Sequence, residues 1–183
     1  MAEKPKILLG VTGGIAAYKV VGLASQLCAE GASVKTVMTH NATQLVGPMS
    51  FEAVTHGPVH TDLWKDMTED SVEHIDLVDW ADIVVVAPAT ANIIGKIAHA
   101  ICDDLLSTIL CACWKKPVLI APAMNVNMWD NPAVQKNIET ISSMGFTILG
   151  PQEGPLACGV VGMGRMAEPE QIQVAIGQFL AKT

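Results

Sequence analysis

Hydrophobic residues fall into short uninterrupted runs along this chain, and longer segments with helical spacing separate the runs. The runs have the length of strands, and their apolar positions are continuous, as in strands that are buried on both faces of a parallel sheet. This pattern predicts strands over residues 6–11, 33–39, 82–89, 117–123 and 146–150. The intervening segments predict helices over residues 16–31, 92–114, 132–145 and 168–183, the second with a break near Asp103.

The alternation of strands and helices predicts a single α/β domain over residues 1–183. Its fold class is doubly wound and flavodoxin- or Rossmann-like, a three-layer sandwich with a mainly parallel sheet between two layers of helices. No internal repeat, low-complexity tract or linker divides the sequence. Residues 49–73 mix helix and loop signals, so their structure is left open.

Ligands of such folds bind beyond the carboxyl ends of the strands, so the residues that follow each strand are candidate binding residues. After the first strand, Gly13 and Gly14 let backbone N–H groups approach a phosphate at the start of the next helix. The spacing is not GxGxxG, and "VMTHN" after the second strand lacks the acidic residue that binds a dinucleotide's ribose. The turn therefore favours a mononucleotide over NAD, and a tight turn without a ligand remains the alternative.

Small, hydroxyl and amide residues also follow the third and fourth strands. The segments "PATAN" (88–92) and "PAMN" (122–125) place them at the same predicted sheet edge. A planar heteroaromatic ring needs donors and acceptors around its rim and close approach of the backbone. Because Thr and Asn are also ordinary helix caps, it is the shared placement of these segments that indicates a site.

Charge and apolar content narrow the class of protein. The net charge is −7 and no run is rich in Lys or Arg, which argues against a nucleic-acid partner. Half of the residues are hydrophobic, yet no run approaches the ~18 residues of a membrane span, and the N-terminus lacks the apolar stretch of a signal peptide. With a mean hydropathy of +0.38, these features predict a cytoplasmic protein that buries apolar surface between subunits.

The cysteines predict neither a disulfide framework nor a metal site, because there are five of them and their spacings match no zinc motif. Those in segments of helical pattern are expected to be small core residues. They are Cys28, Cys102, Cys111 and Cys113. Cys158 differs because it lies in the glycine-rich stretch "GPLACGVVGMGRMAEP" (154–169), whose composition excludes a helix or a central strand.

Five motifs together resemble the flavin-dependent cysteine decarboxylases: "TGGIAAYK", "HIDL", "APATAN", "PAMNVNMW" and "ACGVVGMGRMAEP". The resemblance runs from Lys6 to Pro169, and the last two motifs are its most specific part. It implies FMN as the cofactor, homotrimers that often assemble into dodecamers, and active sites between subunits. It also raises the question, open from the sequence, of whether a phosphopantothenate–cysteine ligase domain is fused to this chain or separate.

The implied reaction is the decarboxylation of 4′-phosphopantothenoylcysteine to 4′-phosphopantetheine in coenzyme A biosynthesis. Oxidation of the substrate's CH2–SH group to a thioaldehyde creates an electron sink beside the carboxylate. Loss of CO2 then gives an enethiol, and its reduction gives the saturated thiol. FMN takes up the hydride in the first step and returns it in the last.

The resemblance also assigns roles to residues. His74 is implied to be a catalytic base or charge partner, and Cys158 a catalytic proton donor. From the residues alone, His74 is better explained as a surface or capping histidine, and His40 is the runner-up. The implied substrate-binding residues are Asn125, Met124, Ala157, Gly159, Arg165 and Met166. The implied FMN-binding residues are Gly13, Gly14, Ile15, Thr39, Ser50, Thr90, Ala91, Asn92 and Ala123.

The glycine-rich stretch is interpreted as a loop that closes Cys158 over the substrate. Its expected hinges are Gly154, Gly159, Gly162 and Gly164. Other functions on this scaffold are a peptidyl-cysteine decarboxylase, a flavin prenyltransferase, a non-catalytic flavin-binding regulatory subunit and an electron-transfer flavoprotein. The loop argues against the prenyltransferase and electron transfer, and the presence of His74, Asn125 and Cys158 argues against the regulatory subunit. The peptide substrate stays open.

Overall fold

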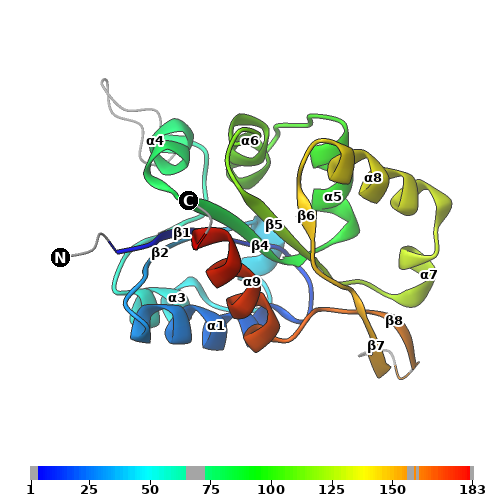
Figure 1. Cartoon of the computed structure of the whole chain (residues 1–183), viewed down its shortest axis with the longest axis horizontal. Helices are drawn as coiled ribbons and strands as arrows, with labels where there is room; N and C mark the ends of the chain where they lie inside the picture. The colour runs from blue at the N-terminus through cyan, green and yellow to red at the C-terminus, as the bar shows by residue number, and fades with distance from the viewer. Residues whose placement is uncertain (1–3, 65–72, 156–158, 160, 182–183) are drawn as a thin grey trace.

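A six-stranded parallel sheet forms the centre of the computed structural model, which describes residues 4–64, 73–155, 159 and 161–181 (Figure 1). The strand order is β3-β2-β1-β4-β5-β6, and every adjacent pair is parallel. The strands are β1 (Lys6–Val11), β2 (Ser33–Met38), β3 (Val59–His60), β4 (Ile83–Ala89), β5 (Val118–Pro122) and β6 (Thr147–Ile148).

Helices cover both faces of this sheet and give the molecule three layers (Figure 1). On one face lie α1 (Ala17–Ala29), α3 (Pro48–Thr55) and α9 (Pro169–Leu180). On the other face lie α4 (Glu73–Trp80), α5 (Ala91–Ala98), α6 (Leu105–Ala112) and α8 (Pro132–Ser143). The short helices α2 (His40–Thr43) and α7 (Val126–Trp129) follow β2 and β5. None of the described helices has both the length and the apolar character needed to cross a bilayer.

The continuous apolar runs are explained by the two helical layers. In β1, Ile7 and Leu9 belong to the core on the α1 side, whereas Leu8 belongs to the core on the α6 side. Every residue of β4 is buried, because both faces of this central strand are covered. The predicted fold class is therefore confirmed, and each predicted strand and helix is present with slightly different ends.

The structure defines two local features that the sequence left imprecise, the break near Asp103 and the segment 49–73. The break predicted near Asp103 separates α5 from α6, and Asp104 caps α6 because its Oδ1 accepts the Ser107 N–H at 2.8 Å. The segment left open by the sequence contains β3 and nearly all of α3. Only Phe51 of α3 is buried, so this helix has no apolar stripe by which its pattern could be recognised.

The glycine-rich stretch forms an antiparallel ribbon apart from the main sheet. Its strands are β7 (Gln152–Pro155) and β8 (Val161–Arg165), and the ribbon lies beside α7 (Figure 1). The exclusion of a helix and of a central strand is thus confirmed. Ala157 and Cys158 lie outside the described residues.

The glycines of β8 pack closely against the segment that follows β5. Met124 N–H donates to the Gly164 carbonyl at 2.9 Å. A Cβ on Gly164 would lie 2.1 Å from the Met124 carbonyl oxygen, and a Cβ on Gly162 would lie 3.0 Å from Val126. These two glycines permit the close approach of β8 to this segment, and their role as hinges stays a prediction. Gly159 differs, because it has a φ of +82° and, among the described residues, no heavy atom lies within 4 Å of a Cβ position.

The cysteines are less buried than expected. Cys113 is buried and Cys28 is half-buried, and burial raises the pKa of the Cys113 thiol to about 12. Cys102 and Cys111 are exposed, and Cys102 lies between α5 and α6, so their prediction as core residues is wrong. The helical pattern of residues 92–114 was identified correctly, but it did not show which thiols of this segment face the core and which face outward.

Candidate functional site

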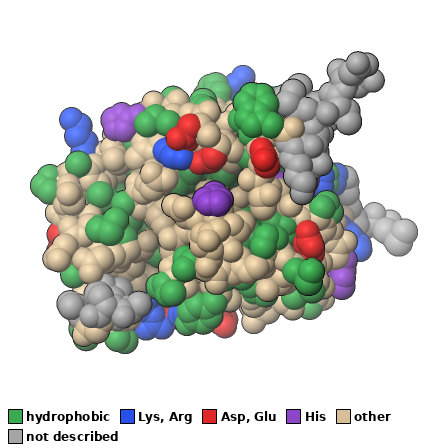
Figure 2. Space-filling model, turned by 180° about the vertical axis from the view of Figure 1, so that it is seen from behind, with side chains coloured by type: hydrophobic (Ala, Val, Ile, Leu, Met, Phe, Trp, Pro, Cys, Tyr) green, Lys and Arg blue, Asp and Glu red, His purple; other side chains and the backbone are tan. Residues whose placement is uncertain are grey.

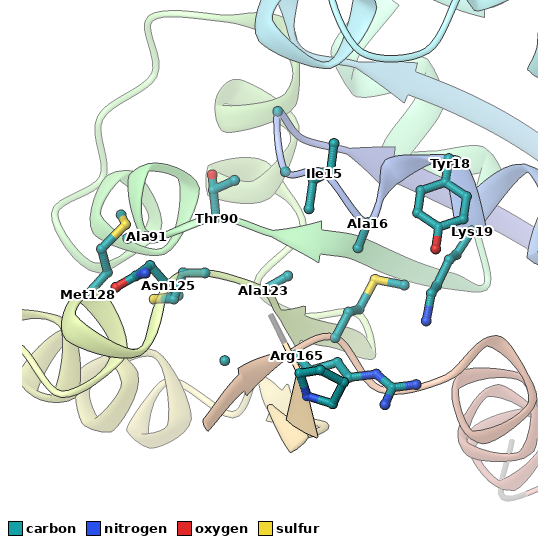
Figure 3. A pocket seen from close by; sticks show the side chains of 16 residues that line it. Ile15, Ala16, Tyr18, Lys19, Thr90, Ala91, Ala123, Asn125, Met128 and Arg165 are labelled. Atoms are coloured by element: carbon teal, nitrogen blue, oxygen red, sulfur yellow. The ribbon is translucent and has the colours of Figure 1, made fainter. Parts of the chain in front are cut away.

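A cavity of about 670 Å³ opens at the carboxyl edge of the sheet, at the boundary between β1 and β4 (Figure 3). This boundary is where the strand order reverses, and doubly wound folds bind their ligands there. The volume is in the range of small-molecule sites. The cavity is lined by Gly13, Gly14, Ile15, Ala16, Tyr18, Lys19, Thr90, Ala91, Ala123, Met124, Asn125, Met128, Pro155, Gly164, Arg165 and Met166.

The turn between β1 and α1 forms one wall of the cavity. A Cβ on Gly13 would lie 2.5 Å from the Asn41 Cβ, and a Cβ on Gly14 would lie 3.2 Å from Pro88. Glycine is therefore needed at Gly13 for the turn to pass this close to its neighbours. Among the described residues, the N–H groups of Ile15 and Ala16 have no protein acceptor, as expected at the start of a helix.

Thr12 joins the ends of β1 and β4 behind this turn. Its buried hydroxyl donates to the Pro88 carbonyl at 2.6 Å and accepts the Thr90 N–H at 3.1 Å. The side chain thereby holds the glycine turn against the segment that begins α5. Sequence reasoning missed Thr12; the available signal was a hydroxyl residue directly after an apolar strand.

The opposite wall is the segment that follows β5. Ala123 N–H donates to the Ala89 carbonyl at 2.9 Å, which ties this wall to the end of β4. Asn125 caps α7, and its Oδ1 accepts the Asn127 N–H at 2.8 Å. This bond fixes which end of the Asn125 amide is oxygen, so the amide's orientation at the cavity is set by the fold.

Two basic residues, Lys19 and Arg165, stand toward one end of the cavity, and Asn125 with Met128 stands at the other (Figure 3). Glu168, just before α9, pairs with Lys19 at 2.9 Å and also with Arg165. The Lys19 ammonium, and next the Arg165 guanidinium, hold the pKa of the Glu168 carboxyl below its usual value. Lys19, Tyr18, Met128 and Glu168 were not predicted, because their relation to the cavity depends on packing between distant segments.

The structure brings together most of the residues that the sequence indicated. Those lining the cavity are Gly13, Gly14, Ile15, Thr90, Ala91, Ala123, Met124, Asn125, Arg165 and Met166. Those described but not lining it are His74, Thr39, Ser50, Asn92 and Gly159. Thr39 lies close by, because its N–H donates to the Val11 carbonyl at 3.0 Å, beside the glycine turn. Ser50 is exposed on α3 and Asn92 is exposed on α5.

His74 is the second residue of α4 and is half-buried. Its helix packs against α6 and against β1. Among the described residues, the cavity of a single chain contains no histidine. An imidazole would therefore have to reach this cavity from elsewhere.

The sequence matches the family described as Flavoprotein over residues 1–181. The chain belongs to the Flavoprotein family. Among its relatives, the coenzyme A biosynthesis bifunctional protein CoaBC of Bacillus subtilis is 49% identical over 172 residues, which are 94% of this chain and 42% of that protein. CoaBC of Vibrio cholerae is 45% identical over 96% of this chain and 44% of its own length. This Flavoprotein-family chain thus spans less than half the length of these two relatives.

Solved structures share the whole fold of this Flavoprotein-family chain. A cysteine-to-serine mutant of PPC decarboxylase complexed with pantothenoylaminoethenethiol has a TM-score of 0.89 and 35% identity, and the match covers 98% of this chain and all of that one. The FMN-binding protein AtHal3 has a TM-score of 0.86 and 35% identity, with 99% of both chains covered.

Proposed function

We propose that this chain binds FMN and decarboxylates 4′-phosphopantothenoylcysteine to 4′-phosphopantetheine, a step of coenzyme A biosynthesis. The observation that carries the proposal is one cavity with two facing walls. One wall is a glycine turn at the N-terminus of α1, and the other carries Asn125, whose amide caps α7. Relatives named CoaBC, and a similar PPC decarboxylase complexed with an enethiol, support the same reaction.

The cavity fits FMN in shape and in polarity. The N–H groups at the start of α1 offer donors to a phosphate, and the helix dipole favours a negative charge there. Gly14, Ala91 and Ala123 leave the backbone open to a flat ring, and Thr90 adds a hydroxyl. When bound, FMN supplies the acceptor and donor of the hydride that the substrate's sulfur-bearing carbon loses and regains.

Asn125 is proposed to hold the substrate carboxylate. The amide N–H2 donates to the carboxylate without the ion pair that would stabilise the ground state more than the transition state. The proposed path oxidises the CH2–SH carbon by loss of a hydride and a proton. The carboxylate then leaves as CO2, and its bonding electron pair forms the C=C bond of an enethiolate. Return of a hydride and of one proton to carbon, with a second proton to sulfur, gives the saturated thiol, so the cycle has no net redox change and consumes one proton.

Cys158 is proposed to donate the final proton, and its position outside the described residues leaves this to experiment. A thiol with a reference pKa of about 8.5 is mostly protonated at neutral pH. Cys158→Ser keeps the size but replaces the thiol with a much weaker acid. The variant should release CO2 once per site, hold the flavin reduced under anaerobic conditions and accumulate the enethiol. Near-normal yields of saturated thiol from this variant would remove Cys158 from the mechanism.

We further propose that His74 acts in the cavity of a neighbouring subunit, within a homotrimer or within a dodecamer built from trimers. The absence of a histidine from the described lining of one chain supports a shared site. Large apolar side chains at the cavity are also exposed in a single chain: Ile15 is 62% exposed, Tyr18 64% and Met128 47%. Exposed apolar groups of this kind are typical of protein interfaces.

The proposed function is tested by incubating the purified, FMN-loaded protein with 4′-phosphopantothenoylcysteine. We expect the mass of the product to be that of the substrate less one CO2, with a saturated thiol. Release of the enethiol as the final product would instead indicate an oxidative decarboxylase of the peptidyl-cysteine type. Bound FMN without any turnover would indicate a regulatory subunit.

A further inference from the structure

His60 and Glu73 form an ion pair at the end of β3. His60 is the last residue of this strand and is in register with Val37 of β2, and Glu73 is the first residue of α4. His60 Nδ1 contacts Glu73 Oε1, and the two side chains are only 14% and 11% exposed. The pair therefore ties the beginning of α4 to the edge of the main sheet.

This pair is poorly explained as a device for stability alone. His60 Nε2 and Glu73 Oε2 are both buried, and neither has a hydrogen-bond partner among the described residues. Enclosed charge pairs gain little or nothing over apolar residues when part of their hydrogen-bonding capacity is unsatisfied. A role in holding a neighbouring group in place accounts for the pair better.

The neighbouring group is His74. Residues three and four apart share one side of a helix, so His74 stands on the same side of α4 as Leu77 and Val78. Both of these are buried in the core, at 2% and 7% exposed. Leu77 and Val78 hold the second turn of the helix in the core. The contact of Glu73 with His60 holds the first turn, which carries His74.

We infer that His60 and Glu73 are a positioning pair for His74. This inference rests on the proposed function, in which His74 is a catalytic residue. Neither member of the pair lines the cavity, so neither is proposed to touch the substrate or FMN. Their contact positions the first turn of α4. Because His74 lies in this turn, the contact also determines where the His74 imidazole stands relative to the reacting atoms.

The inference predicts a loss of turnover without a loss of binding. In Glu73→Gln and in His60→Gln, kcat should fall about 10- to 100-fold, because a displacement on the order of 1 Å is enough to cost that much. KM and the FMN content should stay within about twofold, since the cavity residues are unchanged. Glu139→Gln, the same change at an exposed position of α8, is the matched control and should be normal.

A double-mutant cycle separates positioning from general structural damage. If Glu73 acts only through His74, then Glu73→Gln should have no further effect on the residual rate of His74→Asn. A further fall of 10-fold or more in that background, or loss of FMN or of the oligomer in Glu73→Gln alone, would show that the pair is structural and would overturn the inference.

A second measurement does not depend on turnover. The rate at which diethylpyrocarbonate modifies His74, followed by peptide mass spectrometry, should change several-fold in Glu73→Gln and His60→Gln but not in Glu139→Gln. An unchanged rate would overturn the inference even if the enzyme were active. Wild-type protein that fails to decarboxylate the substrate would count against the proposed function, and the modification rate would still decide on the pair.

Discussion

At the rim of the cavity, one carboxylate holds two cations that come from distant parts of the chain. Glu168 pairs with Lys19, which is 149 residues away in sequence, and with Arg165. The cluster joins the first turn of α1 to the start of α9 and the end of β8. Of its three members only Arg165 was predicted as a site residue, and their joining in one charge network was not predicted.

Glu168→Gln should lower stability in a pH-dependent way. The pKa of the Glu168 carboxyl in the folded protein is below its usual value of 4.5, so the stabilisation from its charge is fully present above that value and is lost as the pH falls through the lowered pKa. At pH 7 the variant should be less stable by about 1 kcal/mol, as for a partly exposed pair. The difference from wild type should shrink below a pH of about 4.5.

Thermal unfolding of wild type and Glu168→Gln between pH 3 and pH 7 measures this difference. Glu139→Gln, which removes an exposed carboxylate of α8, is the control and should follow wild type at every pH. If the difference in stability between Glu168→Gln and wild type stayed constant down to pH 3, the charge of the carboxylate would not be what stabilises the rim of the cavity.

At the scale of elements, patterns that depend on local burial were predictable and pairings between distant segments were not. The apolar runs identified every strand of the main sheet except the short edge strand β3, because helices cover both faces of the sheet. The ribbon of β7 and β8 was not identified, since its glycines carry no pattern and its docking depends on Met124.

The candidate site was predictable to the same extent. The rule that ligands lie beyond the carboxyl ends of strands brought Gly13, Thr90 and Asn125 to one edge, and the structure places all three at one cavity. The rule could not place Lys19 or Thr12, whose roles come from contacts across the sheet edge. It also could not tell that His74 stands outside the cavity of its own chain.

Gly164→Ala should undock the ribbon. The added Cβ would lie 2.1 Å from the Met124 carbonyl oxygen, on backbone with a φ of +145°. Such a conflict cannot be relieved by turning a side chain, so we expect a loss of at least about 2 kcal/mol in the free energy of unfolding, and weaker FMN binding.

Urea unfolding and FMN titration test this expectation against Gly177→Ala. Gly177 lies in α9, and a Cβ there would meet no heavy atom within 4 Å. Alanine favours a helix interior, so this control should be up to about 1 kcal/mol more stable than wild type. If both variants gained stability, the close packing of β8 on the Met124 segment would be wrong.

At the scale of the whole molecule, a single chain exposes many large apolar side chains. Seen from the side opposite to Figure 1, hydrophobic side chains are spread over the surface between polar ones (Figure 2). Over the described chain as a whole, the exposed apolar side chains include Met49 at 76% and Trp114 at 62%, in addition to those at the cavity. Apolar side chains scattered singly are ordinary on a protein surface, so it is the exposed ones at the cavity that support the proposed assembly.

Mixed oligomers test whether the site is shared between subunits. His74→Asn and Asn125→Ala should each be inactive alone. Co-expressed, they should recover activity, because some sites would combine an intact cavity from one chain with an intact His74 from the other. The control pairs His74→Asn with a chain that carries both changes, and it should stay inactive. Mixed oligomers with no recovery would place His74 and Asn125 in the same chain's site.

Six of the sixteen residues that line the cavity have little or no side chain: Gly13, Gly14, Ala16, Ala91, Ala123 and Gly164. A survey that only shortens side chains would therefore pass over these positions, because truncation has almost nothing to remove there. Substitutions that add bulk, such as Ala91→Val or Ala123→Val, are the ones that would reveal it. A mutational map of this protein made only by shortening side chains would understate how much of its recognition is done by the main chain.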